Sequence, residues 1–213
     1  IGNCFVKIAS IYNRMCDFDK ALDFALKGLD IQESFDDKKV ISGTLYLIAT
    51  IHNNREDYIK GLDAFTKLYE IDSKLYKNDS ETIAHTIANI GITYFYNKNY
   101  QKSIDKLLES SHFQNHAEGC TINISIEIYL NLAYKKIEKK YNIKNIPQLI
   151  KDGDKISYKL NFHIYQLLEE SSYLETAYSQ LQEKADNLEP DVAAKFLSYP
   201  IPKAIVEEWE KVK

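Results

Sequence analysis

Three segments of this chain align with one another without gaps, and this internal repeat limits the possible folds more than any other feature. The segments are 8–28, 48–68 and 90–110. The second begins 40 residues after the first, and the third begins 42 residues after the second. Self-similarity at a period of this size indicates an array of supersecondary units, each packed on its neighbours.

Each repeat has the pattern of two helices joined by a short polar turn. Apolar residues recur three and four apart on both sides of turns predicted at 14–17, 54–57 and 97–99. Small residues recur where the two helices of a hairpin approach closely: Ala9, Ala49, Gly91, Ala21, Gly61 and Ser103. An aromatic residue after each turn is expected to fill the gap between that hairpin and the next: Phe18, Tyr58 and Tyr100.

Composition agrees with a helical array. The 213 residues include only 7 Gly and 4 Pro, too few to form the many turns of a sandwich or barrel. Apolar residues make up 45% of the chain, which is enough to bury a sizeable core. The sequence therefore predicts an all-α protein.

With these small and aromatic positions, the repeat resembles the tetratricopeptide repeat (TPR) family in its form of about 40 residues per unit. That form occurs in bacterial signalling proteins and kinesin-light-chain-like adaptors. The resemblance implies a right-handed superhelical solenoid of antiparallel helix hairpins over residues 1–160. A C-terminal capping helix and a Pro-containing tail are expected over 161–213. Four units are expected, at about 1–40, 41–80, 81–121 and 122–160.

The units depart from the family pattern in two respects. The usual Pro at the end of the second helix is absent, so longer loops at 34–39 and 77–80 are expected to replace a sharp stop. The fourth unit is degenerate: its first helix is expected around 128–137 and its second to open at Pro147. Either Asn131 or Ala133 occupies its small-residue position.

The C-terminal part has a different period. Apolar residues follow alternating spacings of four and three between Leu160 and Leu188, interrupted at Ser171. This period of about 3.5 residues is typical of a coiled coil, and a homodimer through 160–188 is one interpretation. The interruption favours the other interpretation, a long helix that caps the repeats. The tail over 196–202 is expected to form an extended turn before a short helix on which Trp209 covers the final hydrophobic face.

Charge and cysteine content bear on partners and compartment. The net charge is −4 and both signs are interspersed, which argues against nucleic acid or an anionic membrane as partner. No apolar run is long enough to span a membrane. Three cysteines without CxxC spacing indicate a reducing compartment, so we expect a cytoplasmic protein. The chain opens inside an amphipathic pattern without Met, and we expect it to be a segment of a longer polypeptide.

The sequence offers little chemistry. His112, His116 and Cys120 share a helical spacing and could ligate zinc, but Gly119 is expected to end the helix before Cys120 joins that face. Nucleophile-elbow, phosphate-loop, zinc-protease and dinucleotide motifs are absent from the sequence. We therefore predict a protein that is not an enzyme and uses no cofactor or metal, with a metal-dependent enzyme as a weaker alternative.

The resemblance implies that the first helices of successive units line a concave groove and contact an extended or helical ligand. The ligand-binding residues predicted on these helices are Lys7, Ser10, Asn13, Arg14, Tyr46, Thr50, Asn53, Asn54, His85, Asn89, Tyr96 and Tyr129. Asn side chains can bind a peptide backbone through donor and acceptor, and Tyr supplies anchoring area. The predicted function is a scaffold that binds another protein or peptide within a signalling protein. The alternative is a peptide-sensing receptor whose superhelix changes conformation.

Overall fold

The computed structural model describes residues 1–76, 80–114, 122–152 and 156–213. Within these ranges the chain forms twelve helices and no strand. The helices belong to two compact units, Ile1–Glu118 and Gly119–Lys213. The predicted boundary at residue 160 falls inside the second unit and stays a prediction.

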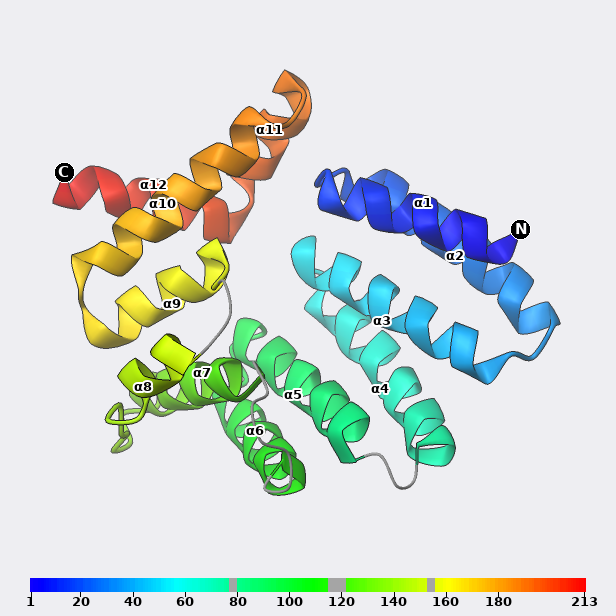
Figure 1. The fold of residues 1–213 in the computed structure, drawn as a ribbon, viewed down its shortest axis with the longest axis horizontal. Helices are drawn as coiled ribbons and strands as arrows, with labels where there is room; N and C mark the ends of the chain where they lie inside the picture. Colours follow the sequence, from blue (N-terminus) through cyan, green and yellow to red (C-terminus); the bar gives the residue numbers. More distant parts are fainter. Residues whose placement is uncertain (77–79, 115–121, 153–155) are drawn as a thin grey trace. The chain divides into compact units, whose positions relative to one another are not determined.

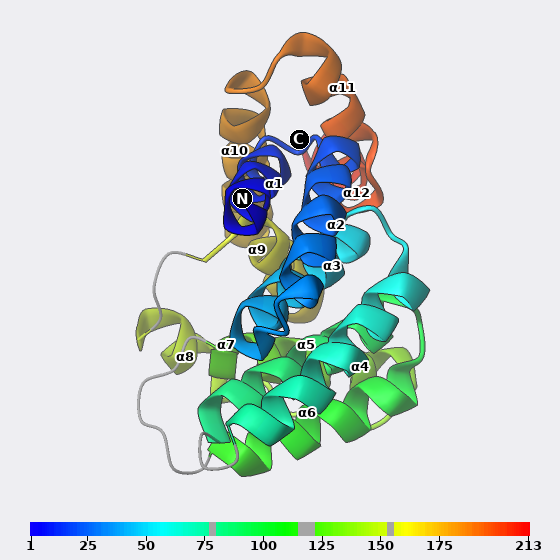
Figure 2. The same cartoon turned by 90° about the vertical axis from the view of Figure 1, so that its right-hand side faces the viewer.

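Unit 1 consists of three consecutive helix hairpins, which Figures 1 and 2 show following one another from blue to green. α2 packs on α3 and α4 packs on α5, so each hairpin stacks on the next. This arrangement confirms the predicted repeat of stacked hairpins. Its helices are α1 (Gly2–Arg14), α2 (Phe18–Ser34), α3 (Lys38–Asn54), α4 (Tyr58–Leu75), α5 (Ser80–Tyr96) and α6 (Tyr100–Gln114).

The turns inside the hairpins share one geometry and confirm the predicted turn positions. The residue at the centre of each turn is in the left-handed region, with φ of 59° at Cys16, 67° at Glu56 and 59° at Lys98. In the first turn, the amide of the next residue, Asp17, donates to the Tyr12 carbonyl oxygen at 3.0 Å. This hydrogen bond pairs a carbonyl oxygen that has no partner within the helix because the helix ends there.

Close packing within each hairpin depends on the small residues that the sequence repeats. Ala9, Ala49 and Ala21 are fully buried. A Cβ at Gly91 would lie 2.9 Å from Leu107 Cγ, and one at Gly61 would collide with the Asn53 carboxamide. The predicted small-residue positions are therefore the points of close helix approach.

The aromatic residues after the turns have different roles. Tyr58 of α4 stacks on Tyr96 of α5 at 5.9 Å between ring centroids, which fills the gap between two hairpins as expected. Tyr100 instead meets Phe95 edge to face at 5.6 Å, within its own hairpin.

A buried polar bridge joins successive hairpins. Asp72, near the end of α4, is 2% exposed and accepts hydrogen bonds from Ser42 Oγ at 2.6 Å and Thr86 Oγ1 at 3.1 Å. Ser42 lies on the first helix of the same hairpin and Thr86 on the first helix of the next. Asp72 therefore ties three helices together at one level of the stack.

The preceding hairpin repeats this bridge with an amide. Gln32 of α2 is 5% exposed, accepts from Thr44 Oγ1 at 2.7 Å and donates to Asn3 Oδ1 at 3.1 Å. Gln32 precedes Asp72 by 40 residues, and Thr44 precedes Thr86 by 42, so both bridges follow the repeat. We call these two sets the inter-hairpin bridges.

In its described residues, unit 2 contains six helices, coloured yellow-green to red in Figure 1. Its first two helices pack on each other, and Pro147 lies in the first turn of the second, as expected. The fourth repeat unit at 122–160 stays a prediction. Both Asn131 and Ala133 are buried on its first helix. The helices are α7 (Ile122–Lys136), α8 (Ile146–Asp152), α9 (Tyr158–Leu168), α10 (Ser171–Asp186), α11 (Pro190–Ser198) and α12 (Pro200–Val212).

The single helix expected over 160–188 is not formed. α9 ends at Leu168, Glu169 adopts a left-handed φ of 61°, and α10 begins at Ser171 and packs back on α9. Ile164, Leu174 and Leu181 are fully buried. The prediction of one long helix is therefore wrong, and much of its apolar stripe is buried within the unit. The homodimer through 160–188 stays a prediction.

The tail is more helical than predicted. Residues 196–198 belong to α11, so the extended turn expected over 196–202 is wrong. Only Tyr199 separates α11 from α12, and its ψ of 144° is the conformation that a residue before proline prefers. Trp209 of α12 stacks on Tyr178 of α10 at 5.2 Å, which confirms its role as an aromatic cover.

Replacing Glu56 by Gly is expected to raise the free energy of unfolding by up to about 1 kcal/mol, because Gly carries no left-handed penalty at this turn. Glu70→Gly is the matched control, since Glu70 is exposed within α4 and the same replacement there costs about 1 kcal/mol. Urea unfolding of both variants measures the difference. A loss of stability in Glu56→Gly as large as in Glu70→Gly would contradict the turn geometry.

Candidate functional site

The predicted groove residues of unit 1 lie on three neighbouring first helices, α1, α3 and α5. Lys7, Ser10 and Arg14 are exposed on α1, and Tyr46 is 37% exposed on α3. The other predicted residues of this unit are partly buried: Asn13, Thr50, Asn53, Asn54, His85, Asn89 and Tyr96. We call the exposed and partly buried members together the first-helix face.

Several asparagines of this face bind neighbouring helices. Asn54 Nδ2 of α3 donates to Asn13 Oδ1 of α1 at 3.2 Å, and Asn53 Nδ2 donates to Thr93 Oγ1 of α5 at 2.7 Å. Asn53 Oδ1 is buried beside Gly61 and has no hydrogen-bond partner in the described part of the chain. These side chains therefore join the three first helices, a role that the sequence did not predict.

Aromatic contacts extend the same face. The Tyr46 ring of α3 lies 5.7 Å from the His85 ring of α5 and meets Phe65 edge to face at 6.0 Å. Asn89 Nδ2 donates to the His85 carbonyl oxygen at 2.8 Å. Burial lowers the pKa of His85, so this ring is neutral near pH 7. The face thus combines exposed cations with a neutral aromatic pair.

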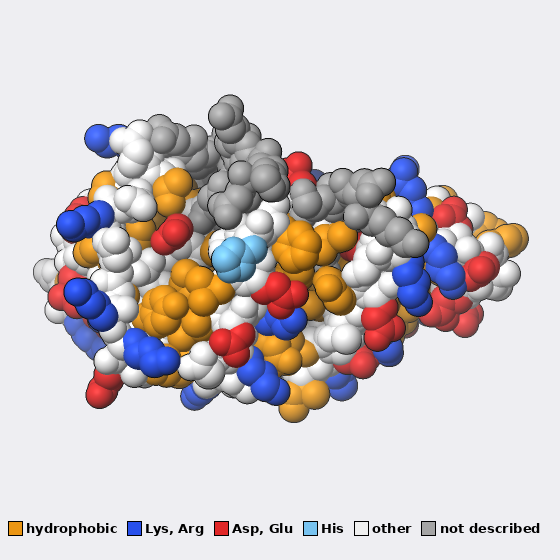
Figure 3. Space-filling model, turned by 90° about the horizontal axis from the view of Figure 1, so that it is seen from below, with side chains coloured by type: hydrophobic (Ala, Val, Ile, Leu, Met, Phe, Trp, Pro, Cys, Tyr) orange, Lys and Arg blue, Asp and Glu red, His pale blue; other side chains and the backbone are white. Residues whose placement is uncertain are grey.

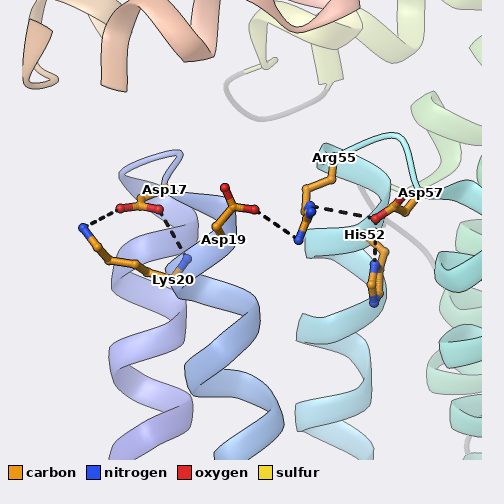
Figure 4. A network of polar contacts seen from close by, with 6 residues as sticks. All are labelled: Asp17, Asp19, Lys20, His52, Arg55 and Asp57. Atoms are coloured by element: carbon orange, nitrogen blue, oxygen red, sulfur yellow. Dashed lines mark hydrogen bonds and ion pairs between the residues drawn. The ribbon is translucent and has the colours of Figure 1, made fainter. Parts of the chain in front are cut away.

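A surface network at the turn end of the first two hairpins was not predicted (Figure 4). Arg55 Nη1 lies 3.2 Å from Asp19 Oδ1 of α2, and Arg55 Nε lies 3.8 Å from Asp57 Oδ2. His52 Nδ1 is 3.5 Å from the same Asp57 oxygen, yet burial, together with the charges of Lys60 and Arg55, lowers the pKa of His52 despite the opposing effect of Asp57. The network contains no nucleophile beside the imidazole, and exposed pairs of this kind contribute at most about 1 kcal/mol each.

In unit 2 the structure corrects one predicted site residue. Tyr129 is only 5% exposed and packs edge to face on His163 at 5.0 Å, so it belongs to the core of the unit and not to a ligand surface. Apolar residues surround Tyr129 on α7, so the sequence does not indicate which side of this helix faces inward. Lys135, on the same helix, binds Glu169 at 3.0 Å and the Gln166 carbonyl oxygen at 2.9 Å.

Unit 2 also has a pocket of about 700 Å³ that sequence reasoning missed. The segment after α7 folds back over that helix, where the Asn142 amide donates to Asn131 Oδ1 at 2.9 Å. The lining combines lysines, tyrosines and amides with a single carboxylate: Glu127, Leu130, Asn131, Tyr134, Lys140, Tyr141, Asn142, Lys144 and Asn145. The pocket forms because a polar segment folds back over α7. The apolar periodicity of the sequence does not indicate such a fold-back.

Two of the three predicted metal-ligand candidates fall outside the residues that the structure describes. His112 is exposed near the end of α6, whereas His116 and Cys120 lie outside the described ranges. Among the residues that the structure describes, no group of three or more His, Cys, Asp and Glu side chains is placed to hold a metal ion. None of the described helices is long and apolar enough to cross a membrane.

Comparisons with known proteins find this architecture in solved structures. No family model and no curated protein matches the chain. The apo form of RapI superposes with a TM-score of 0.66 at 18% identity, over 99% of this chain and 84% of RapI. A Rap protein complexed with Competence and Sporulation Factor superposes with a TM-score of 0.61 at 15% identity. That match covers 100% of this chain, which spans 65% of the Rap chain.

A further match carries the repeat type in its name. The TPR-like repeats of a putative kinesin light chain from Podosopora anserina superpose with a TM-score of 0.56 at 13% identity, over 97% of this chain and 95% of theirs. The chain therefore has a TPR-like fold, an all-α solenoid of helix hairpins. This confirms the predicted fold class.

The stability of unit 2 is expected to depend on the protonation of His163. Burial lowers the pKa of His163 from about 6.5 to about 4, although its contact with Gln166 opposes the shift. Because the unfolded chain takes up this proton first, the free energy of unfolding falls as pH drops from about 6.5 to about 4, by on the order of 3 kcal/mol. Denaturant unfolding across this pH range measures the fall.

His163→Phe retains an aromatic ring beside Tyr129 and removes the titration, so its unfolding profile is expected to be flatter between pH 6.5 and 4. His112→Gln, at an exposed position, is the control and retains the slope of the parent chain. An unchanged slope in His163→Phe would contradict the assignment of the proton to His163.

Proposed function

We propose that this chain is a scaffold that binds another protein or a peptide, and that its ligand lies along the first-helix face of unit 1. The observation that carries the proposal is the side-by-side arrangement of α1, α3 and α5, joined by the Asn54–Asn13 and Asn53–Thr93 hydrogen bonds. Three rigid helices present one continuous row of side chains, so a ligand can contact several repeats at once. The proposal assigns no catalytic step to this chain.

The exposed side chains of the face suit a protein ligand. Arg14 and Tyr46 belong to the residue types that dominate binding energy at protein interfaces, and Lys7 adds a second cation on α1. The cations favour an acidic ligand segment, and the Tyr46 ring favours an apolar or aromatic side chain beside it. An acidic peptide with an aromatic anchor is the ligand class that fits these groups.

The net charge of −4 and the charges on the face in Figure 3 also favour a protein ligand over nucleic acid. The face in Figure 3 shows acidic and basic side chains interspersed with groups of hydrophobic ones. Such a surface lacks the basic stripe through which proteins neutralise phosphates. A place within a larger cytoplasmic signalling protein accords with the similarity to Rap structures, one of which holds Competence and Sporulation Factor.

A peptide-sensing role is the second candidate, and the contacts between first helices favour it. A ligand that displaces Asn54 Nδ2 from Asn13 Oδ1, or Asn53 Nδ2 from Thr93 Oγ1, breaks the bonds that join α1 to α3 and α3 to α5. Binding would then change the spacing of the hairpins, which is the differential contact that a conformational switch requires. A scaffold with a fixed superhelix would leave these bonds in place.

The ligand face is tested by selecting peptides from a random display library on the purified chain and measuring their affinity by fluorescence anisotropy. Lys7→Ala, Arg14→Ala and Tyr46→Ala combined are expected to weaken the selected peptides at least about tenfold, because a cationic and an aromatic anchor are lost. All three positions are exposed, so helicity is expected to be unchanged.

The matched control replaces the same number of side chains on the second helices: Lys27→Ala, Lys67→Ala and Tyr69→Ala. It is expected to bind like the parent chain. If the control loses the peptides and the first-helix variant retains them, the ligand lies on the second helices and the proposal is wrong. A change in hairpin spacing on peptide binding, measured by distances between spin labels on α1 and α5, would favour the sensing role.

A further inference from the structure

The pocket of unit 2 is lined by one side of α7 and by the segment that follows this helix. The α7 residues recur three and four apart, so they lie on the same side of the helix. They are Glu127, Leu130, Asn131 and Tyr134, and the other lining residues belong to 140–145. A volume of about 700 Å³ lies within the range of sites for small molecules. We call this cavity the α7 pocket.

The segment after α7 is held in place at three points. Where the helix ends, the Lys139 amide donates to the Tyr134 carbonyl oxygen at 3.0 Å. The Asn142 amide donates to Asn131 Oδ1 at 2.9 Å, and Ile146 beyond it is fully buried. The pocket is therefore formed without a ligand, so binding requires little ordering of the chain.

The charged side chains of the α7 pocket have both signs. Asn131 is 4% exposed, and its Nδ2 donates to Glu127 Oε2 at 3.2 Å and to the Glu127 carbonyl oxygen at 2.8 Å. A buried amide thus orients the Glu127 carboxylate. Among the described residues, neither this carboxylate nor the ammonium groups of Lys140 and Lys144 form an ion pair.

This combination of charges selects against ligands that have only one sign of charge. A simple anion meets the Glu127 carboxylate, and a simple cation meets Lys140 and Lys144. A ligand with both signs can pair with all three groups through charge-assisted hydrogen bonds. Tyr134 and Tyr141 add aromatic surface against which an apolar side chain can pack.

We propose that the α7 pocket binds a small zwitterion, namely a free amino acid or a dipeptide. Its ammonium group donates to the Glu127 carboxylate, and its carboxylate accepts from Lys140 and Lys144. Asn131 is a positioning residue, because it fixes both Glu127 and the segment that carries the lysines. The pocket belongs to unit 2 and the first-helix face to unit 1, so this inference does not depend on the proposed function.

The test screens the standard amino acids, and the dipeptides that join alanine to each of them, by thermal shift of the full chain. Isothermal titration calorimetry then gives the Kd of the best probe, which is expected to be about 1 mM or lower. Its N-acetylated and C-amidated forms are each expected to bind at least about threefold more weakly, because each lacks one of the two charges.

Two variants assign these charges to the pocket. Glu127→Gln is expected to weaken the unmodified probe at least about threefold without weakening the N-acetylated form, and it leaves an acceptor for Asn131. Lys140→Gln and Lys144→Gln combined are expected to weaken the unmodified probe to a similar extent without weakening the amidated form. Both lysines are exposed, so this variant alone decides the outcome if Glu127→Gln is not helical.

The matched controls remove the same charges at exposed positions outside the lining: Glu175→Gln, and Lys136→Gln combined with Lys151→Gln. They are expected to bind the probe like the parent chain, as is the combined first-helix variant of unit 1. If no probe gives a heat of binding, or if the pocket variants bind like the parent chain, the proposal is wrong. An N-acetylated or amidated form that binds as tightly as the unmodified probe would also overturn it, since the ligand would then not be recognised as a zwitterion.

Discussion

The inter-hairpin bridges are the constraint on which the rest of unit 1 depends. A carboxylate that is 2% exposed, as Asp72 is, stabilises a fold only if its oxygens are hydrogen-bonded. Ser42 and Thr86 donate these hydrogen bonds from two different first helices. Both bonds form only in one alignment of α3, α4 and α5. If one hairpin shifted along the other, the Asp72 carboxylate would lose a partner. The same alignment brings α3 and α5 close enough for the Asn53–Thr93 bond and the Tyr46–His85 contact, and so forms the first-helix face.

The repeats could be predicted because their physical requirements recur in the sequence. Ala9, Ala49 and Gly91 mark the close approach of paired helices, and turn positions follow from polar residues between apolar runs. The inter-hairpin bridges were also present in the sequence, as Gln32 and Asp72 at the repeat spacing. The sequence alone does not predict their burial, because polar residues near a helix end are ordinarily exposed.

The break between α9 and α10, the burial of Tyr129 and the bonds between first helices depend on tertiary packing. The periodicity of apolar residues does not determine that packing. An apolar spacing of four and three between Leu160 and Leu188 is compatible with one helix or with two that fold together, and the left-handed residue that divides them is Glu169, not a glycine. The position of Tyr129 on a first helix predicts a surface residue, yet Tyr129 is 5% exposed and packs against His163. The asparagines of the face, which the sequence offers as ligand groups, also form two hydrogen bonds that join first helices.

The measurement that tests this account most directly is a double-mutant cycle between Asp72→Ala and Thr86→Val, read as the free energy of urea unfolding. If Asp72 aligns the second and third hairpins, the two substitutions are expected to couple by about 1 kcal/mol or more, because each removes the partner of the other across the hairpin interface. Free energies that add to within about 0.3 kcal/mol would contradict the account, since Asp72 would then not set the register of the hairpins.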